Sequence, residues 1–268
     1  LDGKRRRSHA FFVVRPAPTS TARILLALST NTWHAYNEFG GPSLYTGNTQ
    51  VSLQRPMSPG FLHKPPGHGR RVTVVGPPDP QMAGHVGYLQ LNHLSAWAGS
   101  AGWPDWEHPF LAWAEANGYA VDVVTNADLE DHPELLLGGR SAVDNRYDLF
   151  LSVGHDEYWS GTQRANVEAA RNAGVHLAFF SGNEVFWKTR WENSIAPGNA
   201  PYKTLVSYKE THANARIDPS GVWTGTWRDP RFSPPADGGR PENALTGQLF
   251  MVNGYRADAI TVPALFSQ

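Results

Sequence analysis

Four short apolar runs constrain the fold of this 268-residue chain more than any other feature. Each run is rich in aliphatic or aromatic side chains and poor in charge, which is typical of β-strands that are covered on both faces. The runs are residues 23–29 (RILLALS), 120–125 (AVDVVT), 147–153 (YDLFLSV) and 176–181 (HLAFFS). Because strands buried in this way are usually parallel, the runs predict a mostly parallel sheet.

Helical patterns lie between the later runs. Residues 106–118 (WEHPFLAWAEANG) place Phe110, Trp113 and Ala114 on one helix face, and residues 160–174 (SGTQRANVEAARNAG) form a second helical pattern. Alternating strands and helices favour right-handed crossovers between parallel strands. We therefore expect an α/β fold with three layers, in which helices flank a mostly parallel sheet.

The chain contains 26 Gly, 21 Pro and 10 Trp, which predicts long, aromatic-rich and Pro/Gly-rich loop insertions. Residues 30–105 form the longest irregular stretch, and residues 190–268 are predicted to be loops with short strands at 203–209 (KTLVSYK) and 247–252 (GQLFMV). No internal repeat is visible, so we expect residues 1–268 to form a single domain. Because the chain begins at Leu1, we expect it to be a piece of a longer protein.

Charge and cysteine content exclude several classes of partner and site. The formal net charge of −1 disfavours binding to nucleic acid, and the basic run at residues 4–7 (KRRR) is interpreted as a solvated tail. No apolar segment approaches the roughly 20 residues that cross a bilayer, so no membrane partner is expected. The absence of Cys excludes disulfides, thiolate ligands and a cysteine nucleophile. We expect a cytoplasmic protein, with secretion as the alternative.

Polar residues follow each of the four predicted strands. They are residues 30–36 (TNTWHAY), Asn126, residues 154–157 (GHDE) and residues 182–184 (GNE). In open parallel sheets, ligands bind beyond the carboxyl ends of the strands. The four clusters therefore predict one ligand site at this edge of the sheet.

His155 and Glu157 are the strongest candidates for chemistry at that edge. If the chain stays extended after the strand, both side chains point the same way and Asp156 points the other way, into a structural role. A His and a carboxylate on one side favour general acid/base catalysis or metal binding. The alternative is that His155 binds a backbone group while Glu157 caps the helix that follows. Asn183 either orients a substrate carbonyl or forms an Asx turn.

Two further segments are weaker candidates. Glu184 could act as a second carboxylate, although the pattern favours a surface position. Residues 31–45 (NTWHAYNEFGGPSLY) either line a small apolar pocket or form a packed loop. The packed loop is a stronger possibility for Trp33 than it is for Tyr36.

The chain contains neither GxxxxGK[ST] nor a GxGxxG motif after a strand, so no nucleotide cofactor is expected. It also lacks the GxSxG motif of serine hydrolases of the α/β class.

Six blocks of sequence carry a resemblance to a known family. They are STNTWHAYNEFGGPSLY, VSLQRPM, FLAWAEANGYAVDVVTNADLE, LSVGHDEYWS, AFFSGNEVFWKTR and RPENALTGQLF, in this order. Together they resemble the C-terminal domain of the large (β) subunit of N,N-dimethylformamidase and its relatives, from about Ser8 to the last residue. The resemblance implies a fold similar to class I glutamine amidotransferases, with residues 154–156 at the turn where those enzymes carry a cysteine nucleophile.

The resemblance also implies a mononuclear ferric iron held by two tyrosines and one glutamate. Glu157 matches the glutamate, and Tyr36 is the best match for the first tyrosine. For the second tyrosine, Tyr45 is one candidate, while the other matching position holds Met57. Phenolate and carboxylate oxygens are hard, anionic ligands that suit ferric iron.

Two further site residues follow from the same resemblance. His155 matches the catalytic histidine and Asn183 an active-site asparagine. We also expect Trp33, Asn37 and Trp187 to contact substrate. The family also uses a catalytic glutamate near the C-terminus of the domain, and the final residues VPALFSQ do not match that segment. That glutamate would then come from a continuation of the chain, or this chain does not perform the family reaction alone.

These observations predict an amidohydrolase acting on C–N bonds other than peptide bonds, which performs metal-assisted hydrolysis of a small, formamide-type amide. The expected partners are the small-molecule amide, a small partner subunit and further copies of the chain. One alternative is a non-catalytic or degenerate domain that binds a small ligand or carbohydrate. The other is a metal-free hydrolase that uses His155 with Glu157 or Glu184.

Overall fold

The computed structural model describes residues 10–37, 41–57, 62, 102–104, 106–137, 147–231 and 239–251. The elements in chain order are β1 (Ile24–Leu28), α1 (Thr30–Tyr36), β2 (Gln50–Ser52), α4 (Glu107–Ala116), β3 (Val121–Thr125), α5 (Asn126–Asp131), α6 (Glu134–Leu137), β4 (Leu149–Val153), β5 (Tyr158–Ser160), α7 (Gly161–Asn172), β6 (His176–Phe180), β7 (Trp187–Glu192), β8 (Thr204–Val206), α8 (Glu210–Ala213) and α9 (Asn243–Thr246).

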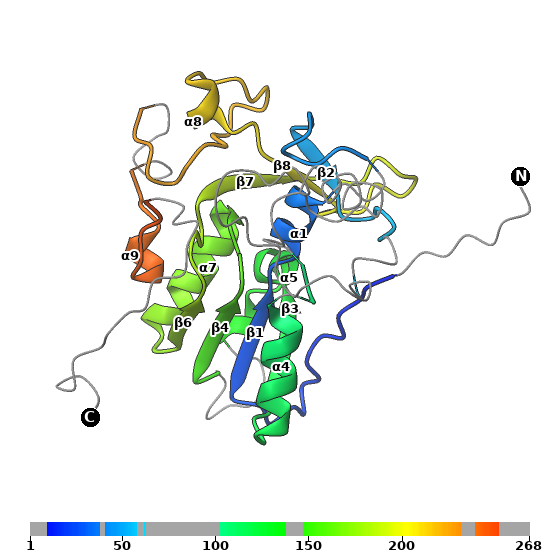
Figure 1. Ribbon diagram of the computed structural model, residues 1–268, viewed down its shortest axis with the longest axis vertical. Coiled ribbons are helices and arrows are strands. Elements are labelled where there is room, and N and C mark those ends of the chain that lie inside the picture. Colours follow the sequence, from blue (N-terminus) through cyan, green and yellow to red (C-terminus); the bar gives the residue numbers. More distant parts are fainter. Residues whose placement is uncertain are drawn as a thin grey trace, which may run out of the picture.

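The centre of the fold is a four-stranded sheet in the order β3-β1-β4-β6. All three pairings are parallel, as Figure 1 shows. Each strand lies within one of the four apolar runs, so the predicted parallel sheet is confirmed. The inner strands β1 and β4 are buried at four of their five residues, whereas the edge strands β3 and β6 are mostly half-buried.

Helices cover both faces of this sheet, and the two faces form separate cores. On one face Leu25 of β1 and Phe150 of β4 lie in a cluster with Val167 of α7. On the other face Leu26 of β1 belongs to a cluster against which Phe110 of α4 packs. The α/β class is therefore confirmed, while the glutamine amidotransferase-like topology stays a prediction.

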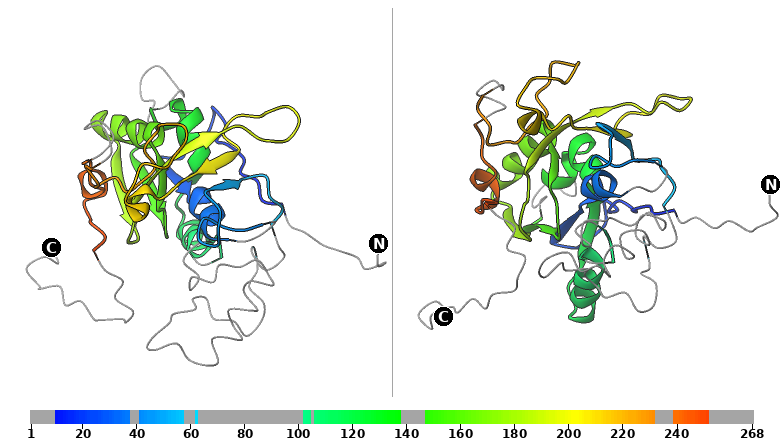
Figure 2. Two further views of the ribbon diagram at one scale, coloured as in Figure 1. Left: turned by 90° about the horizontal axis from the view of Figure 1, so that it is seen from above. Right: turned by 45° about the horizontal axis from the view of Figure 1, so that its top comes forward.

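A second sheet lies over the carboxyl end of the first (Figures 1 and 2). Its order is β2-β8-β7-β5, with β2 and β7 antiparallel to β8 and β5 parallel to β7. Strand β8 lies within the predicted strand 203–209, which is confirmed. The sheet places residues from distant parts of the chain above the edge where the polar clusters follow β1, β3, β4 and β6.

The first segment of the predicted loop region is instead a helix. Residues 30–36 form α1, directly after β1, and all seven of its residues are buried. A helix that is enclosed on all sides has no solvent-facing stripe, so its sequence shows none of the amphipathic period that predicts surface helices. Strand β2 also interrupts the predicted loop. Residues 63–101, which make up most of its remainder, lie outside the described residues.

Two smaller expectations were wrong. Residues 247–251, the described part of GQLFMV, form no strand. Trp113 does not share the buried face of α4 with Ala114; it is 54% exposed and stacks on Tyr119, with ring centroids 5.8 Å apart.

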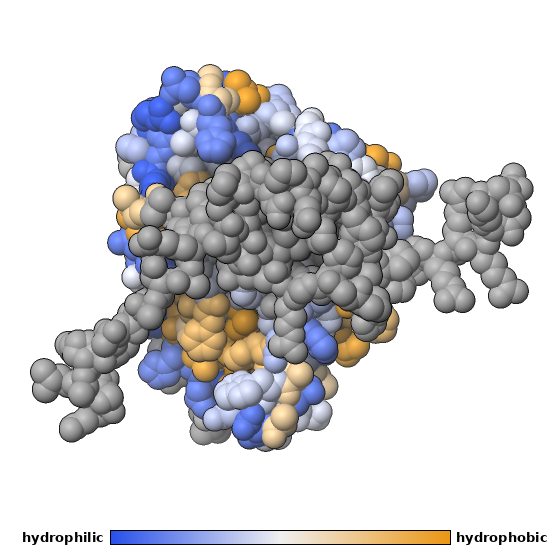
Figure 3. Space-filling view, in the orientation of Figure 1, coloured by the Kyte–Doolittle hydropathy of each residue, from blue (hydrophilic) through white to orange (hydrophobic). Residues whose placement is uncertain are grey.

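Figure 3 shows apolar residues gathering at the lower end of the central sheet, whereas hydrophilic residues predominate around α8.

Candidate active site

The carboxylate of Glu157 is the centre of a buried polar cluster. Its Oε2 atom accepts a hydrogen bond from the Tyr36 hydroxyl at 2.6 Å and from the Tyr45 hydroxyl at 3.2 Å. The Nε2 atom of His155 lies 3.1 Å from the same oxygen. The other oxygen, Oε1, accepts a hydrogen bond from Nδ2 of Asn183 at 3.0 Å. Four side chains thus converge on one carboxylate that is 3% exposed.

The turn after β4 presents His155 and Glu157 to the same side, as predicted. Asp156 faces the opposite way, where its carboxylate accepts hydrogen bonds from Nδ2 of Asn126 at 3.2 Å and from Oγ of Ser152 at 3.1 Å. The turn begins at Gly154, whose φ of +87° lies in the left-handed region that favours glycine. The helix cap assigned to Glu157 as an alternative is made by Ser160 instead, whose side chain accepts from the backbone N–H of Gln163.

The four polar clusters that follow the central strands do meet at one edge. Asn126, after β3, accepts a hydrogen bond through Oδ1 from the backbone N–H of Asn31 in α1 at 2.9 Å. Asn183, after β6, reaches Glu157. Asn183 has a φ of +58°, a left-handed conformation that Asn tolerates better than most residues and that turns its side chain into the cluster.

The two tyrosines come from separate segments. Tyr36 is the last residue of α1, and Tyr45 lies in the turn before β2. Their ring centroids are 4.4 Å apart, so their hydroxyls approach Glu157 side by side. The Tyr45 oxygen also accepts a hydrogen bond from the hydroxyl of Tyr158 at 2.7 Å.

Burial and mutual charge set the protonation states of the cluster. Burial, and then the negative charge of Glu157, raise the pKa of Tyr36 and of Tyr45 well above the ordinary tyrosine value. Burial opposes ionisation of Glu157, but the hydrogen bond and charge of His155 lower its pKa below the ordinary value. The same contact with Glu157 raises the pKa of His155 against the effect of burial. The metal-free cluster therefore consists of two neutral phenols around a carboxylate that pairs with an imidazole.

Lys209 belongs to the site and was not predicted from the sequence. Its Nζ atom lies 3.1 Å from the centroid of the Tyr45 ring and 5.5 Å from that of Trp187, which places the ammonium group within the range of cation–π contacts. Burial lowers the pKa of Lys209 to about 8. Lys209 is the last residue of the predicted strand 203–209. Its position at a strand end was the signal available, but only the second sheet brings that end to the cluster.

The family model described as N,N-dimethylformamidase beta subunit-like, C-terminal, matches residues 1–266. The chain belongs to this family. No curated protein matches the chain. Among the helices in the described ranges, none has the length and apolar character needed to span a membrane.

The family resemblance left open whether the second tyrosine is Tyr45 or is replaced at Met57. The Tyr45 hydroxyl lies against Glu157, whereas Met57 is 7% exposed and packs in the apolar core that surrounds the cluster. Of the two candidate positions, Tyr45 thus places an oxygen beside the Glu157 carboxylate and Met57 does not.

The three residues predicted to contact substrate lie at different depths. Trp33 is completely buried, and its indole N–H donates to Oε1 of Glu107 at 3.0 Å. Asn37 donates through Nδ2 to the backbone carbonyl of Trp33 at 2.8 Å and so ends α1. Both residues support the helix that carries Tyr36 and do not join the cluster around Glu157. Trp187 is also buried, but it lies beside Lys209 at the margin of the cluster.

A second group of carboxyls lies beneath the cluster. The surface position favoured for Glu184 was wrong, because this side chain is 1% exposed. It accepts a hydrogen bond from Oγ of Ser152 at 3.3 Å, and that hydroxyl also contacts Asp156. Burial raises the pKa of Asp156 to about 7, and burial together with the charge of Asp156 raises the pKa of Glu184. The backbone N–H of Val185 donates to the carbonyl of Asp156 at 2.9 Å, which holds the turn after β6 against the turn after β4 and encloses Glu184.

The donor atoms around Glu157 fit a hard metal ion. In the described part of the chain, no three His, Cys, Asp or Glu side chains gather as a metal-binding group, so a metal here would depend on phenol oxygens. Tyr36 and Tyr45 supply two such oxygens, which lie 2.6 and 3.2 Å from Oε2 of Glu157. Oδ1 of Asn183 is buried beside them and has no hydrogen-bond partner among the described residues. An orphaned acceptor at this point indicates that the cluster is built to receive something further.

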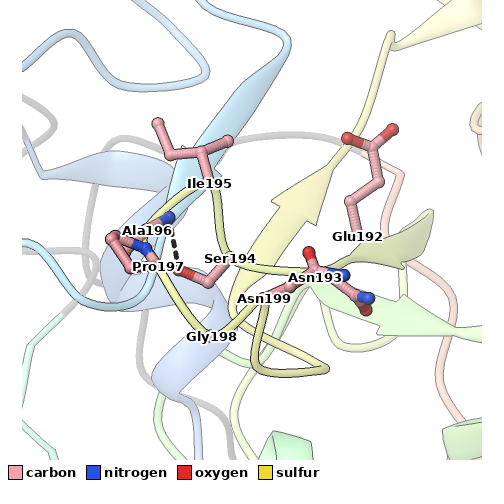
Figure 4. Close-up of a pocket in the computed structure, with 8 residues that line it drawn as sticks. All are labelled: Glu192, Asn193, Ser194, Ile195, Ala196, Pro197, Gly198 and Asn199. Carbon is pink, nitrogen blue, oxygen red and sulfur yellow. Dashed lines mark hydrogen bonds between the residues drawn. The ribbon is translucent and has the colours of Figure 1, made fainter.

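A surface hollow at the turn between β7 and β8 is a separate feature. Figure 4 shows that it is lined by residues 192–199 of a single hairpin, in which Ser194 accepts from the backbone N–H of Ala196. None of the predicted site residues lines it. With Glu192 as its one ionisable group, this hollow offers no pair of groups for catalysis.

Proposed function

We propose that the chain hydrolyses a small amide of the formamide type with the help of a mononuclear ferric ion. The observation that carries the proposal is the convergence of the Tyr36 and Tyr45 hydroxyls on the carboxylate of Glu157. The name of the family, which is that of an amide hydrolase, supports the reaction class. It also refers to a β subunit, and on that ground we propose that the chain works with a partner subunit.

Tyr36, Tyr45 and Glu157 would hold the metal. All three donors are hard oxygens, and two phenolates with one carboxylate would neutralise a trivalent ion. When bound, the ion supplies a Lewis acid that polarises an amide carbonyl. The buried surroundings strengthen this effect, because charges interact more strongly where water is excluded.

His155 is placed to hold and deliver a proton. Its Nε2 atom lies 3.1 Å from both the Tyr36 hydroxyl and Glu157, and its Nδ1 atom lies 3.3 Å from the carbonyl of Gly182. A ring held at both nitrogens keeps one orientation. In the metal-free cluster the contact with Glu157 raises the pKa of His155 against the effect of burial, and an imidazole held in this way suits transfer of a proton to the nitrogen of the leaving amine.

Asn183 and Lys209 complete the polar wall. Nδ2 of Asn183 fixes Glu157, which leaves Oδ1 facing the cluster as an acceptor for an N–H group of the substrate. The ammonium group of Lys209 lies over the ring of Tyr45, where a positive charge favours the anionic form of the phenol. In this proposal Asn183 orients the substrate, and Lys209 balances the negative charge of the Tyr45 phenolate.

Four of the described tryptophans are too deeply buried to stack on a carbohydrate. Trp33, Trp187, Trp223 and Trp227 are all 2% exposed or less, so their faces are covered by protein. Stacking on a sugar requires an accessible ring face. The metal-free alternative rests on His155 and Glu157 as well, and metal analysis separates it from the proposal.

The test is a titration of the purified chain with ferric iron, followed by elemental analysis and a visible spectrum. We expect about one iron per chain and the charge-transfer colour of a phenolate–iron bond. Glu157→Gln should lose both. Glu184→Gln is the matched control, because it changes a buried carboxyl nearby that touches neither phenol, and it should retain both. Equal iron content and colour in the wild type and Glu157→Gln would refute the site.

A further inference from the structure

We infer that Tyr158 is a positioning residue that holds the Tyr45 oxygen in place for the metal and makes the two phenol ligands unequal. The inference rests on the proposed function. Tyr158 is not one of the four side chains that contact the Glu157 carboxylate, and it would not itself bind the metal.

The position of Tyr158 is fixed by backbone contacts on two sides. It begins β5, where it pairs in parallel register with Trp187 of β7. Its backbone carbonyl accepts a hydrogen bond from Nδ2 of Asn31 at 3.0 Å. The side chain is completely buried. A ring held in this way has little freedom, so its hydroxyl stays directed at one partner.

That partner is the oxygen of Tyr45. The Tyr158 hydroxyl donates to it at 2.7 Å, the usual distance for a good O–H···O bond. Tyr45 in turn donates to Glu157 at 3.2 Å, which is a longer contact than the 2.6 Å bond from Tyr36. The bond from Tyr45 to the carboxylate is thus the weaker of the two. The position of the Tyr45 hydroxyl therefore depends more on a second partner, Tyr158.

The hydrogen bond would change character with a metal in place. Tyr45 would bind as a phenolate after releasing its proton to solvent, and its oxygen would then act only as an acceptor. Tyr158 would keep its proton and continue to donate, in a stronger, charge-assisted bond. The oxygen of Tyr36 has an imidazole neighbour instead, His155 at 3.1 Å. The two ligands would thus differ in their donors and in their electron-donating strength.

The consequence is spectroscopic and does not depend on turnover. A hydrogen bond to a phenolate stabilises its electrons and moves its charge-transfer band to shorter wavelength. In iron-loaded Tyr158→Phe we expect the band to move to longer wavelength and the affinity for iron to fall. Tyr147→Phe is the matched control. Tyr147 is 3% exposed and donates to Asp122 at 2.8 Å near the start of β4, so this variant also loses one buried hydroxyl bond but should leave the band unchanged.

A measurement on the metal-free protein tests the hydrogen bond on which this inference depends. Buried hydroxyl protons exchange slowly, so the Tyr158–Tyr45 bond should give a downfield proton resonance that is absent from both Tyr158→Phe and Tyr45→Phe. A band and an iron affinity that are unchanged in Tyr158→Phe would overturn the positioning role while leaving the metal site intact. A wild-type protein that binds no iron would overturn both, even where the resonance is found.

A second variant covers the case in which Tyr158→Phe fails to fold. Replacing Tyr158 with 3-fluorotyrosine keeps the ring and the hydroxyl but makes the hydroxyl a stronger donor. We expect the band of the iron-loaded protein to move to shorter wavelength, opposite to the shift in Tyr158→Phe. A band at the wild-type position in this variant would count against the inference.

Discussion

Glu107 should make the stability of the protein fall as the pH rises. It is the first residue of α4, yet it is completely buried. Its Oε1 atom accepts hydrogen bonds from the indole of Trp33 at 3.0 Å and from the backbone N–H of Ser29 at 3.3 Å, while Oε2 is buried with no partner among the described residues. Burial raises the pKa of Glu107 from 4.5 to about 7. Ionisation is therefore less favourable in the folded chain than in the unfolded one.

The size of the effect follows from that difference. Because the folded pKa is raised, the stabilising contribution is complete below pH 4.5 and is lost as the pH rises through 7. At about 1.4 kcal/mol per pKa unit, ionising Glu107 lowers the free energy of unfolding by about 3 kcal/mol. Glu107→Gln keeps an acceptor oxygen but cannot ionise. Relative to the wild type, its free energy of unfolding should rise by about 2.5 kcal/mol between pH 5 and pH 8.

Urea unfolding followed by tryptophan fluorescence measures this difference at each pH. Asp156, whose pKa is also raised to about 7, and Glu184 titrate in both proteins, so their contributions largely cancel in the comparison. Glu115→Gln is the matched control, because that side chain lies in the same helix and is exposed. Its curve should run parallel to the wild type. A constant gap between Glu107→Gln and the wild type from pH 5 to pH 8 would refute the reasoning.

Three more variants test the site and the turn that carries it. Gly154→Ala should lower the free energy of unfolding by about 3 kcal/mol or more, since a Cβ at this left-handed residue would lie 2.3 Å from Cβ of Trp106; thermal unfolding measures the loss, and an unchanged midpoint would contradict it. His155→Gln should keep the iron colour but reduce release of amine from small formamides by about 100-fold, whereas wild-type turnover would exclude a proton-transfer role. Lys209→Met should stabilise the metal-free protein at pH 7 by about 2 kcal/mol, because burial lowers the pKa of Lys209 to about 8; urea unfolding that shows no gain would contradict this.

The central sheet could be predicted from the sequence because its strands are apolar runs, most clearly the inner strands β1 and β4, which are buried at four of their five residues. Burial on all sides also made helix α1 impossible to recognise in the sequence. A helix enclosed between two sheets needs no polar face, and residues 30–36 combine small polar and aromatic side chains without a helical stripe. The strands β5 and β7 could not be predicted either. Their pairing joins segments that are separated by α7 and β6, and it depends on where the second sheet lies.

Some residues of the candidate site could be predicted from the sequence and others could not. His155, Glu157 and Asn183 follow central strands, so their positions in the chain were enough to place them at one edge of the sheet. Tyr45 and Lys209 reach that edge only through the second sheet and the turns beside it. Local sequence patterns describe which residues end a strand, whereas they carry no information about which distant loop covers that end.

The covering sheet also decides what Glu157 can do. In an open sheet edge its carboxylate would be solvated, and two tyrosines nearby would have water as their partner. Under the second sheet the carboxylate is 3% exposed, so it is the acceptor on which the Tyr36 and Tyr45 hydroxyls depend. Removing this carboxylate would leave buried hydroxyl donors without their acceptor, which lowers stability whether or not a metal binds. Loss of stability in Glu157→Gln therefore says nothing about function. Iron content and colour do, because buried hydroxyls that merely share a carboxylate have no reason to give up their protons.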